Sequence, residues 1–122
     1  MEGHLGGLRE RVKQAFASAG LATIQSHLVP ENEVWVVQRL TLEGSSTTSG
    51  GNTRARVYIN THGDKLYLTE QDAPAADTLY ELVESFRLYP RERIAAEWDQ
   101  AQAATTLILV MVGYRLLYPV ER

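Results

Sequence analysis

The chain has 122 residues, enough for one domain with its own core. Apolar residues make up 44% of it and charged residues 22%, a composition that excludes wholesale disorder. Its net charge of −3 disfavours nucleic-acid binding as the main task, because affinity for phosphate comes from clustered Lys and Arg.

The sequence contains no cysteine, which removes disulfides, thiol catalysis and thiolate metal sites and fits synthesis in a reducing cytosol. The longest apolar run, 107–113, has the length of a strand and falls short of the roughly 18 residues that a membrane span needs. The first residues, MEGHLGGLRERVKQ, lack the apolar region of a signal peptide. We therefore expect no membrane partner.

The segment 8–20, LRERVKQAFASAG, predicts a helix of about three turns. Leu8, Val12 and Phe16 follow one another at intervals of four, which places them on one helical face, and Gly20 stands where a C-terminal cap is expected. Two roles are open: the helix caps one end of the domain, or it packs on a neighbouring subunit. We assign residues 1–20 to an N-terminal helix or arm, with Leu8, Val12 and Phe16 as its contact residues.

From Leu21 onward the apolar period changes to two. Five stretches predict strands: ATIQSHLV, EVWVVQRLTLE, RARVYIN, KLYLTE and TTLILVMVGYRLLY. TLYELVESFRLY fits either a helix or a distorted strand, and its neighbours favour a strand. With LYPRERIAAEW, this makes about seven to eight strands, joined by connections too short for a parallel α/β fold. Residues 21–122 are therefore predicted to form a mainly β domain, an antiparallel β-sandwich or jelly roll.

Two stretches share one pattern of turn and strand: LVPENEVWVV, residues 28–37, and LYPRERIAAEW, residues 88–98. In each, a proline presets the turn, polar residues follow, and an apolar strand begins. We expect the two units to occupy equivalent places in the two halves of the sandwich. In the first unit, Trp35 or its neighbours Val34 and Val36 are predicted to enter the core.

No motif for catalysis or cofactor binding stands out. The Gly- and Ser-rich loop 44–52 lacks the lysine of a nucleotide-binding loop, and no serine lies in GxSxG. His62, Asp64 and Glu70 are the best metal candidates, but a turn around Gly63 explains the first two as well. A glycosidase needs paired carboxylates, yet for Glu97 and Asp99 we favour an acidic strand end. We therefore predict no enzyme, no cofactor and no metal.

One strand offers a candidate interface. The alternation in RARVYIN places Arg54, Arg56 and Tyr58 on one face, opposite an apolar face. This polar face is either a docking surface or a solvated face with ion pairs. As a set, the six tyrosines favour an interface, with protein or with sugar.

Three stretches together resemble the small jelly-roll structural proteins of tailed bacteriophages: HLVPENEVWVVQRLTLE, RARVYINTHGDKLYLTEQDAPAADTLY and LYPRERIAAEWDQAQAATTLILVMVGYRL. In that family a Val-Pro turn leading to Trp opens one strand, a Leu-x-Pro-x-Glu turn opens another, and a late strand ends in Gly-Tyr. The matching residues are Val29, Pro30 and Trp35, then Leu88, Pro90 and Glu92, then Gly113 and Tyr114. The resemblance covers roughly residues 27 to 117, with Asn32 and Arg91 where such turns often carry glycine.

The resemblance implies a structural protein of the virion, made in the host cytoplasm, that contacts the major capsid protein or other virion proteins. The leading role is a capsid cement or decoration protein that oligomerises on the head shell, with a trimer favoured. The alternative is a neck, baseplate or tail-fibre module that binds protein or host-surface carbohydrate. Truncation of residues 1–20 is expected to abolish binding to the shell while leaving the sandwich folded. The resemblance transfers no catalytic residues.

Overall fold

The computed structural model describes residues 4–17, 20–45, 54–72, 78–101 and 104–118, and within these ranges it contains nine strands and no helix. The strands are β1 (His4–Phe16), β2 (Gly20–Gln25), β3 (Glu33–Gly44), β4 (Arg54–Thr61), β5 (Asp64–Asp72), β6 (Tyr80–Leu82), β7 (Phe86–Leu88), β8 (Glu92–Ala101) and β9 (Thr105–Leu117). Among the same residues, no helix is long and apolar enough to cross a bilayer.

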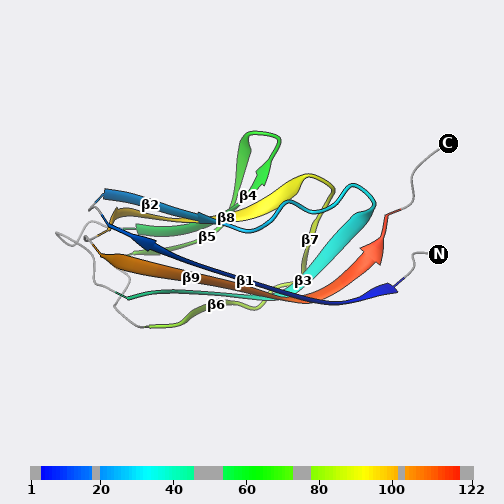
Figure 1. Ribbon diagram of the computed structural model, residues 1–122, viewed down its shortest axis with the longest axis horizontal. Coiled ribbons are helices and arrows are strands. Elements are labelled where there is room, and N and C mark those ends of the chain that lie inside the picture. The colour runs from blue at the N-terminus through cyan, green and yellow to red at the C-terminus, as the bar shows by residue number, and fades with distance from the viewer. Residues whose placement is uncertain (1–3, 18–19, 46–53, 73–77, 102–103, 119–122) are drawn as a thin grey trace.

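The strands form two antiparallel sheets that face each other as two layers (Figure 1). Sheet A has the order β1-β9-β3-β6, with β7 also paired to β3. Sheet B has the order β2-β8-β4-β5. The pairs β1 with β9, β2 with β8, β3 with β6 and β7, and β4 with β5 are nested within one another along the chain. This nesting is the connectivity of a jelly roll. The predicted antiparallel sandwich is confirmed, but the described residues form nine strands where about seven to eight were predicted.

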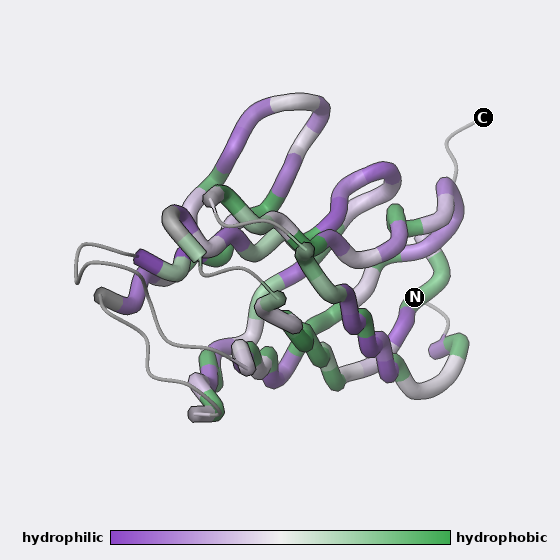
Figure 2. Tube along the Cα trace, turned by 60° about the vertical axis from the view of Figure 1, so that its left-hand side comes forward, coloured by the Kyte–Doolittle hydropathy of each residue, from purple (hydrophilic) through white to green (hydrophobic). Residues whose placement is uncertain are grey.

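The core lies between the sheets and follows the period-two alternation of their strands. In β9, Leu107, Leu109 and Met111 are fully buried, whereas the residues between them point outward. Trp35 of β3 enters the central cluster, as predicted, while Val34 and Val36 are buried outside that cluster. Figure 2 shows hydrophobic stretches in the strands of the body and a mostly hydrophilic hairpin, made by β4 and β5, that projects at the top.

The predicted N-terminal helix is wrong, because these residues form strand β1. β1 pairs with β9 from His4 to Phe16, so it is a full-length strand of sheet A. Leu8 is 6% exposed and belongs to the core, and Val12 and Phe16 pack against that core. The boundary proposed at residue 20 therefore separates two strands of one sandwich in the isolated chain.

The ambiguous segment 78–89 is a strand with an interruption. β6 and β7 both pair with β3, at Leu40–Leu42 and at Trp35–Val37, and residues 83–85 between them are unpaired. The bulge of β3 lies between these two pairings, since its register against β9 shifts between Val37 and Arg39. The interruption therefore coincides with the bend in the partner strand.

The two proline turns lie at corresponding places, as their shared pattern predicted. The connection from β2 to β3 and the connection from β7 to β8 both cross between the sheets. They are hydrogen bonded to each other, because the Val29 N–H donates to the Glu92 carbonyl at 2.9 Å and the Arg91 N–H donates to the Val29 carbonyl at 2.9 Å. Within the second turn, the Glu92 N–H donates to the Tyr89 carbonyl at 3.0 Å.

Arg91 adopts a left-handed backbone conformation in the second proline turn. Its φ is +66°, in the left-handed region that disfavours every residue with a Cβ, whereas Asn32 is not among the positive-φ residues. We expect Arg91→Gly to raise the free energy of unfolding by about 1 kcal/mol or slightly less. Asn32→Gly is the matched control and should lower it. A denaturant titration that finds Arg91→Gly no more stable than the parent would contradict this reading of the turn.

Candidate functional site

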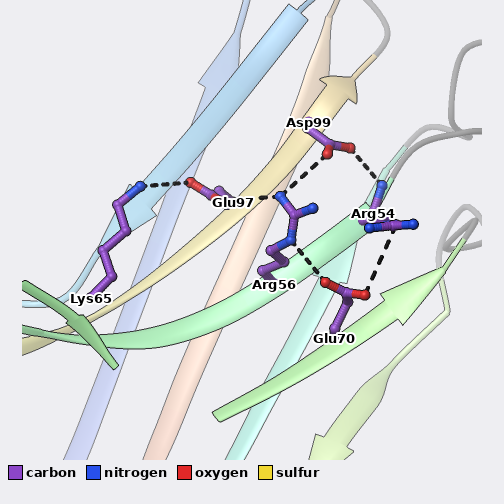
Figure 3. A network of polar contacts seen from close by, with 6 residues as sticks. All are labelled: Arg54, Arg56, Lys65, Glu70, Glu97 and Asp99. Atoms are coloured by element: carbon purple, nitrogen blue, oxygen red, sulfur yellow. Dashed lines mark hydrogen bonds and ion pairs between the residues drawn. The ribbon is translucent and has the colours of Figure 1, made fainter. Parts of the chain in front are cut away.

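The outer face of sheet B carries a network of charged side chains (Figure 3). Arg56 of β4 lies at its centre, between Glu97 of β8 and Glu70 of β5, which are its register partners. Its Nε donates to Glu70 Oε2 at 2.9 Å, and its Nη1 lies 3.4 Å from Asp99 Oδ2 and 3.6 Å from Glu97 Oε1. Lys65 Nζ lies 3.8 Å from the other oxygen of Glu97. The network thus joins three strands of sheet B.

This network neutralises itself. Its three cations, Arg54, Arg56 and Lys65, face three carboxylates, Glu70, Glu97 and Asp99. The hydrogen bond that Arg56 donates to Glu70 and the charges of Asp99, Glu70 and Glu97 raise the pKa of Arg56. Glu97 is 6% exposed, so its charge is held by cations rather than by water. Glu97 and Asp99 do lie on one face, as predicted, and each is bound to Arg56.

Tyr58 is placed on this outer face by the alternation of β4, yet it is only 4% exposed. Its ring is covered by the ring of Tyr67, whose centroid is 5.4 Å away in an edge-on arrangement, and by Lys65 Nζ at 5.0 Å. Burial raises the pKa of the Tyr58 hydroxyl, and the nearby charge of Lys65 opposes that rise. Of the three residues predicted for this face, Arg54 is the exposed one and Arg56 is partly exposed.

The raised pKa of Tyr58 predicts a loss of stability at alkaline pH. Below pH 10 the folded and unfolded chains both hold the proton, so the group contributes nothing to the pH dependence. Above pH 10 the unfolded chain releases its proton first, and the free energy of unfolding falls as pH rises. Tyr58→Phe should show a shallower decline between pH 10 and 11 in thermal melts, with Tyr67→Phe as the matched variant. An unchanged decline would contradict the assignment to Tyr58.

Of the three candidate metal residues, His62 and Asp64 lie at the tip of the β4–β5 hairpin, whereas Glu70 lies further along β5, where it pairs with Arg56. Thr61 pairs with Asp64, so His62 and Gly63 form a two-residue turn, with φ values of +55° and +96°. The Asn60 side chain accepts from the Gly63 N–H at 3.1 Å. No group of three or more potential metal ligands occurs in the described part of the chain. The turn interpretation of this segment is therefore the one that the geometry supports.

A small, partly enclosed pocket lies at the edge of the sandwich, between β3 and β6 on one side and β4 and β5 on the other. It has a volume of about 100 Å³, with a floor of Leu40, Leu42, Ala55 and Val57. Its rim is polar and includes Glu70 and Glu81. A space of this size holds a few water molecules or one small side chain.

A second charged surface, on sheet A, was missed by the sequence analysis. Arg9, Arg11 and Lys13 of β1 are exposed and alternate with inward-pointing residues. Their register partners on β9 are the outward-pointing Val112, Val110 and Ile108. We call the three cations the β1 cation row. Its signal in the sequence was the alternation in RERVK, within the segment that was interpreted there as a helix.

No ion pair engages the β1 cation row within the parts of the chain that are described; Glu43 of β3 lies on the far side of Ile108 from Lys13. The ion pairs found there join other cations to carboxylates, as in Arg39 with Glu81, Arg91 with Glu31 and Arg115 with Glu33. The side chains next to the row on β9 are aliphatic. The row is thus a local excess of positive charge on a chain whose net charge is −3.

No protein-family model matches this chain, and no curated protein matches it. A chain described as part of the cyanophage Pam1 capsid asymmetric unit aligns over 93% of this chain and 86% of its own length, with a TM-score of 0.58 and 14% identity. A subunit of Bacillus endospore appendages, a family of disulfide-linked pili, aligns over 98% and 92%, with a TM-score of 0.47 and 12% identity.

A further match is the N-terminal cellulose-binding domain of a β-1,4-glucanase from Cellulomonas fimi. It aligns over 96% of this chain and 81% of its own length, with a TM-score of 0.40 and 16% identity. Of the three likenesses, only that to the cyanophage capsid chain has a TM-score that carries weight, and at this identity it speaks for the fold. The fold that this chain shares with it is an antiparallel β-sandwich.

Proposed function

We propose that the chain is a structural protein of a bacteriophage particle. The observation that supports this most is the likeness to the cyanophage capsid chain, since it extends over 93% of one chain and 86% of the other and includes no large unmatched domain. The chain's own residues agree with a role that needs no chemistry. Its charged network is satisfied internally, and its partly enclosed pocket has a volume of about 100 Å³.

Within the particle, the proposed place is the head, as a cement or decoration protein on the major capsid protein. Such a protein acts by burying surface across the junctions of the shell, about 800 Å² per partner, and symmetry repeats that contact many times. We propose a homo-oligomer on the shell, with a trimer favoured because a shell offers three-fold positions. A position in the neck or tail is the alternative within the same proposal.

The surfaces proposed for these contacts follow from the geometry. Leu8, Val12 and Phe16 face the sandwich's own interior, so they can reach a neighbour only if β1 leaves its sheet. The N-terminal contribution is therefore proposed to come from the outward side of β1. On sheet B, Arg54 offers an exposed charge at the edge of the network, while Tyr58 supports Tyr67 from beneath.

The test is whether particles carry the chain. Particles from the phage that encodes it should contain it in a copy number set by the shell's symmetry, and particles made without it should rebind the purified protein to saturation. Quantitative mass spectrometry of purified particles measures the first, and co-sedimentation measures the second. Absence of the chain from purified particles, or rebinding that never saturates, would contradict the proposal.

A carbohydrate-binding module is the second candidate function. Exposed aromatic side chains would form its sugar-binding surface. Tyr67 is 53% exposed, Tyr89 44% and Tyr118 39%. Tyr89 and Tyr118 contact each other edge-on at 6.0 Å, away from the β4–β5 face that carries Tyr67. A flat platform of stacked rings is not formed by these three. A glycan array separates the candidates, because a cement protein should show no sugar preference.

A further inference from the structure

We propose that β1 is a docking edge for an extended acidic segment of a partner protein, which adds to sheet A as a further strand. The inference deepens the proposed function, on which it rests only for the identity of the partner. It brings together three observations: an edge strand of unusual length, a row of cations along it, and a charge pattern that disfavours pairing with a second copy.

The edge is the first observation. Among the described strands, β1 is the terminal strand of sheet A and pairs with β9 alone. With 13 residues it is as long as any strand in the sandwich, whereas β6 at the opposite edge has 3. A strand at a sheet edge presents a row of unpaired N–H and C=O groups to any chain that can extend along it. The side chain of Arg115 approaches the carbonyls of Leu5 and Gly7, at 3.5 and 3.3 Å, so the open length begins near Leu8.

The charges are the second observation. Arg9, Arg11 and Lys13 lie on one face of this open length, about 7 Å apart from one to the next, because alternate residues of a strand are two rises apart. Carboxylates at alternate positions of an added strand would lie opposite them, about 5 Å away between Cβ atoms. Each such pair stabilises a ladder that the backbone already favours.

The row also selects against a second copy of this chain. Antiparallel pairing of two β1 strands centred on Arg11 would place Arg11 opposite Arg11 and Arg9 opposite Lys13. Like charges directly opposite each other destabilise a strand pair. The three cations therefore disfavour pairing with a second copy of β1 and favour pairing with an acidic strand.

Protein is a better occupant than nucleic acid. A nucleic acid could meet the three cations but not the backbone edge, and the chain as a whole is acidic, with a net charge of −3. On sheet A, the strand next to the row offers Ile108, Val110 and Val112 rather than aromatic rings on which bases could stack. A peptide strand uses both the edge and the row.

The test uses the whole protein and a designed peptide in which three glutamates alternate with valine and threonine. The peptide should bind, measured by fluorescence anisotropy, with an affinity that falls as salt rises, and it should protect the amides of β1 from hydrogen exchange. The counterpart with lysine in place of glutamate should not bind. Two further peptides are N-methylated, one at the odd-numbered and one at the even-numbered amides. Each keeps its charges but can no longer donate hydrogen bonds along one of its two edges. The peptide whose blocked edge faces β1 should not bind, and the other should bind as before.

On the protein side, the variant Arg9→Glu with Arg11→Glu and Lys13→Glu should weaken peptide binding about a hundredfold, since three attractive pairs become repulsive. Arg87→Glu, which reverses one cation on β7 at the other side of sheet A, should leave it unchanged. The inference is overturned if no peptide binds, if the lysine peptide binds as well, or if neither pattern of N-methylation matters. It is also overturned if an oligothymidylate binds more tightly than the glutamate peptide.

The peptide result and the particle result can fail separately. If the peptide binds as described but particles lack the chain, the docking edge stands and the virion role falls. If the triple variant, shown to be folded by circular dichroism, still saturates particles with unchanged affinity, the virion role stands and the docking edge falls. A variant that does not fold is replaced by Arg11→Glu alone, for which about a fivefold loss is expected.

Discussion

Gly113→Ala should unfold the sandwich or cost it about 3 kcal/mol or more, the largest effect expected of any single methyl group in this chain. A Cβ at residue 113 would lie 1.9 Å from the Val36 carbonyl oxygen and about 3 Å from two further backbone atoms of β3. These are backbone atoms of the central strand pair, so no side chain can rotate to make room. The bulge of β3 between Val37 and Arg39 presses its main chain onto Gly113, its partner in register.

The matched control is Gly7→Ala. Gly7 lies on the neighbouring strand and pairs with Tyr114, and a Cβ there would meet nothing within 4 Å. It should change the free energy of unfolding by less than about 1 kcal/mol. Urea titrations of both variants measure the difference. If the two variants lose similar stability, the close approach of β3 to Gly113 is not a feature of the folded protein.

Deleting residues 1–17 should leave a chain that does not fold, the opposite of what an independent arm predicts. The deletion removes the whole of β1, takes Leu8 out of the core and uncovers one side of β9, whose Leu109 and Met111 are fully buried. Far-ultraviolet circular dichroism and the loss of a cooperative thermal transition would report this. A truncated chain that melts cooperatively near the parent temperature would contradict the place of β1 in the sandwich.

A gentler pair of variants tests the same claim without deleting a strand. Leu8 is 6% exposed and Leu5, on the same strand, is 42% exposed. Leu8→Ala should cost about 2 kcal/mol or more, and Leu5→Ala less than about 1 kcal/mol. Equal losses would indicate that β1 lies loosely on the core.

The one misassigned element shows where sequence periodicity stops being informative. Leu8, Val12 and Phe16 are four residues apart, and an interval of four fits the 3.6-residue helix as well as the two-residue strand. The strand interpretation also requires Glu10 to point inward, and burial of an unpaired carboxylate is costly. At the edge of the sheet it costs little, because Glu10 accepts hydrogen bonds from the His27 N–H at 2.8 Å and from its Nδ1 at 2.7 Å.

Strands with strict alternation were predictable from the sequence. RARVYIN placed Ala55, Val57 and Ile59 in the core, as observed, because β4 lies between two strands and one of its faces is fully covered. The two proline turns were equally readable, since proline and the residues after it act locally. Arg91 stands where such turns often carry glycine, and it does adopt a positive φ, the conformation that glycine favours.

For the surfaces, the sequence predicts which face of a single strand a residue lies on, but not which residues of other strands it contacts. The sequence gives the face on which Arg56 and Tyr58 lie, but not that Glu70 and Glu97 meet Arg56 from two other strands, or that Tyr67 and Lys65 cover Tyr58. Those partners depend on register and strand order. For the same reason the β1 cation row was hidden, since it exists only once β1 is known to be a strand.

The most direct test of the proposed role is a cryo-electron microscopy difference map between particles with and without the chain. We expect additional density on the outside of the shell, at symmetry-related positions, into which the two-sheet sandwich fits with β1 against an extended segment of the shell. Density that is absent from the shell, or that fits the sandwich with β1 facing solvent, would contradict this expectation.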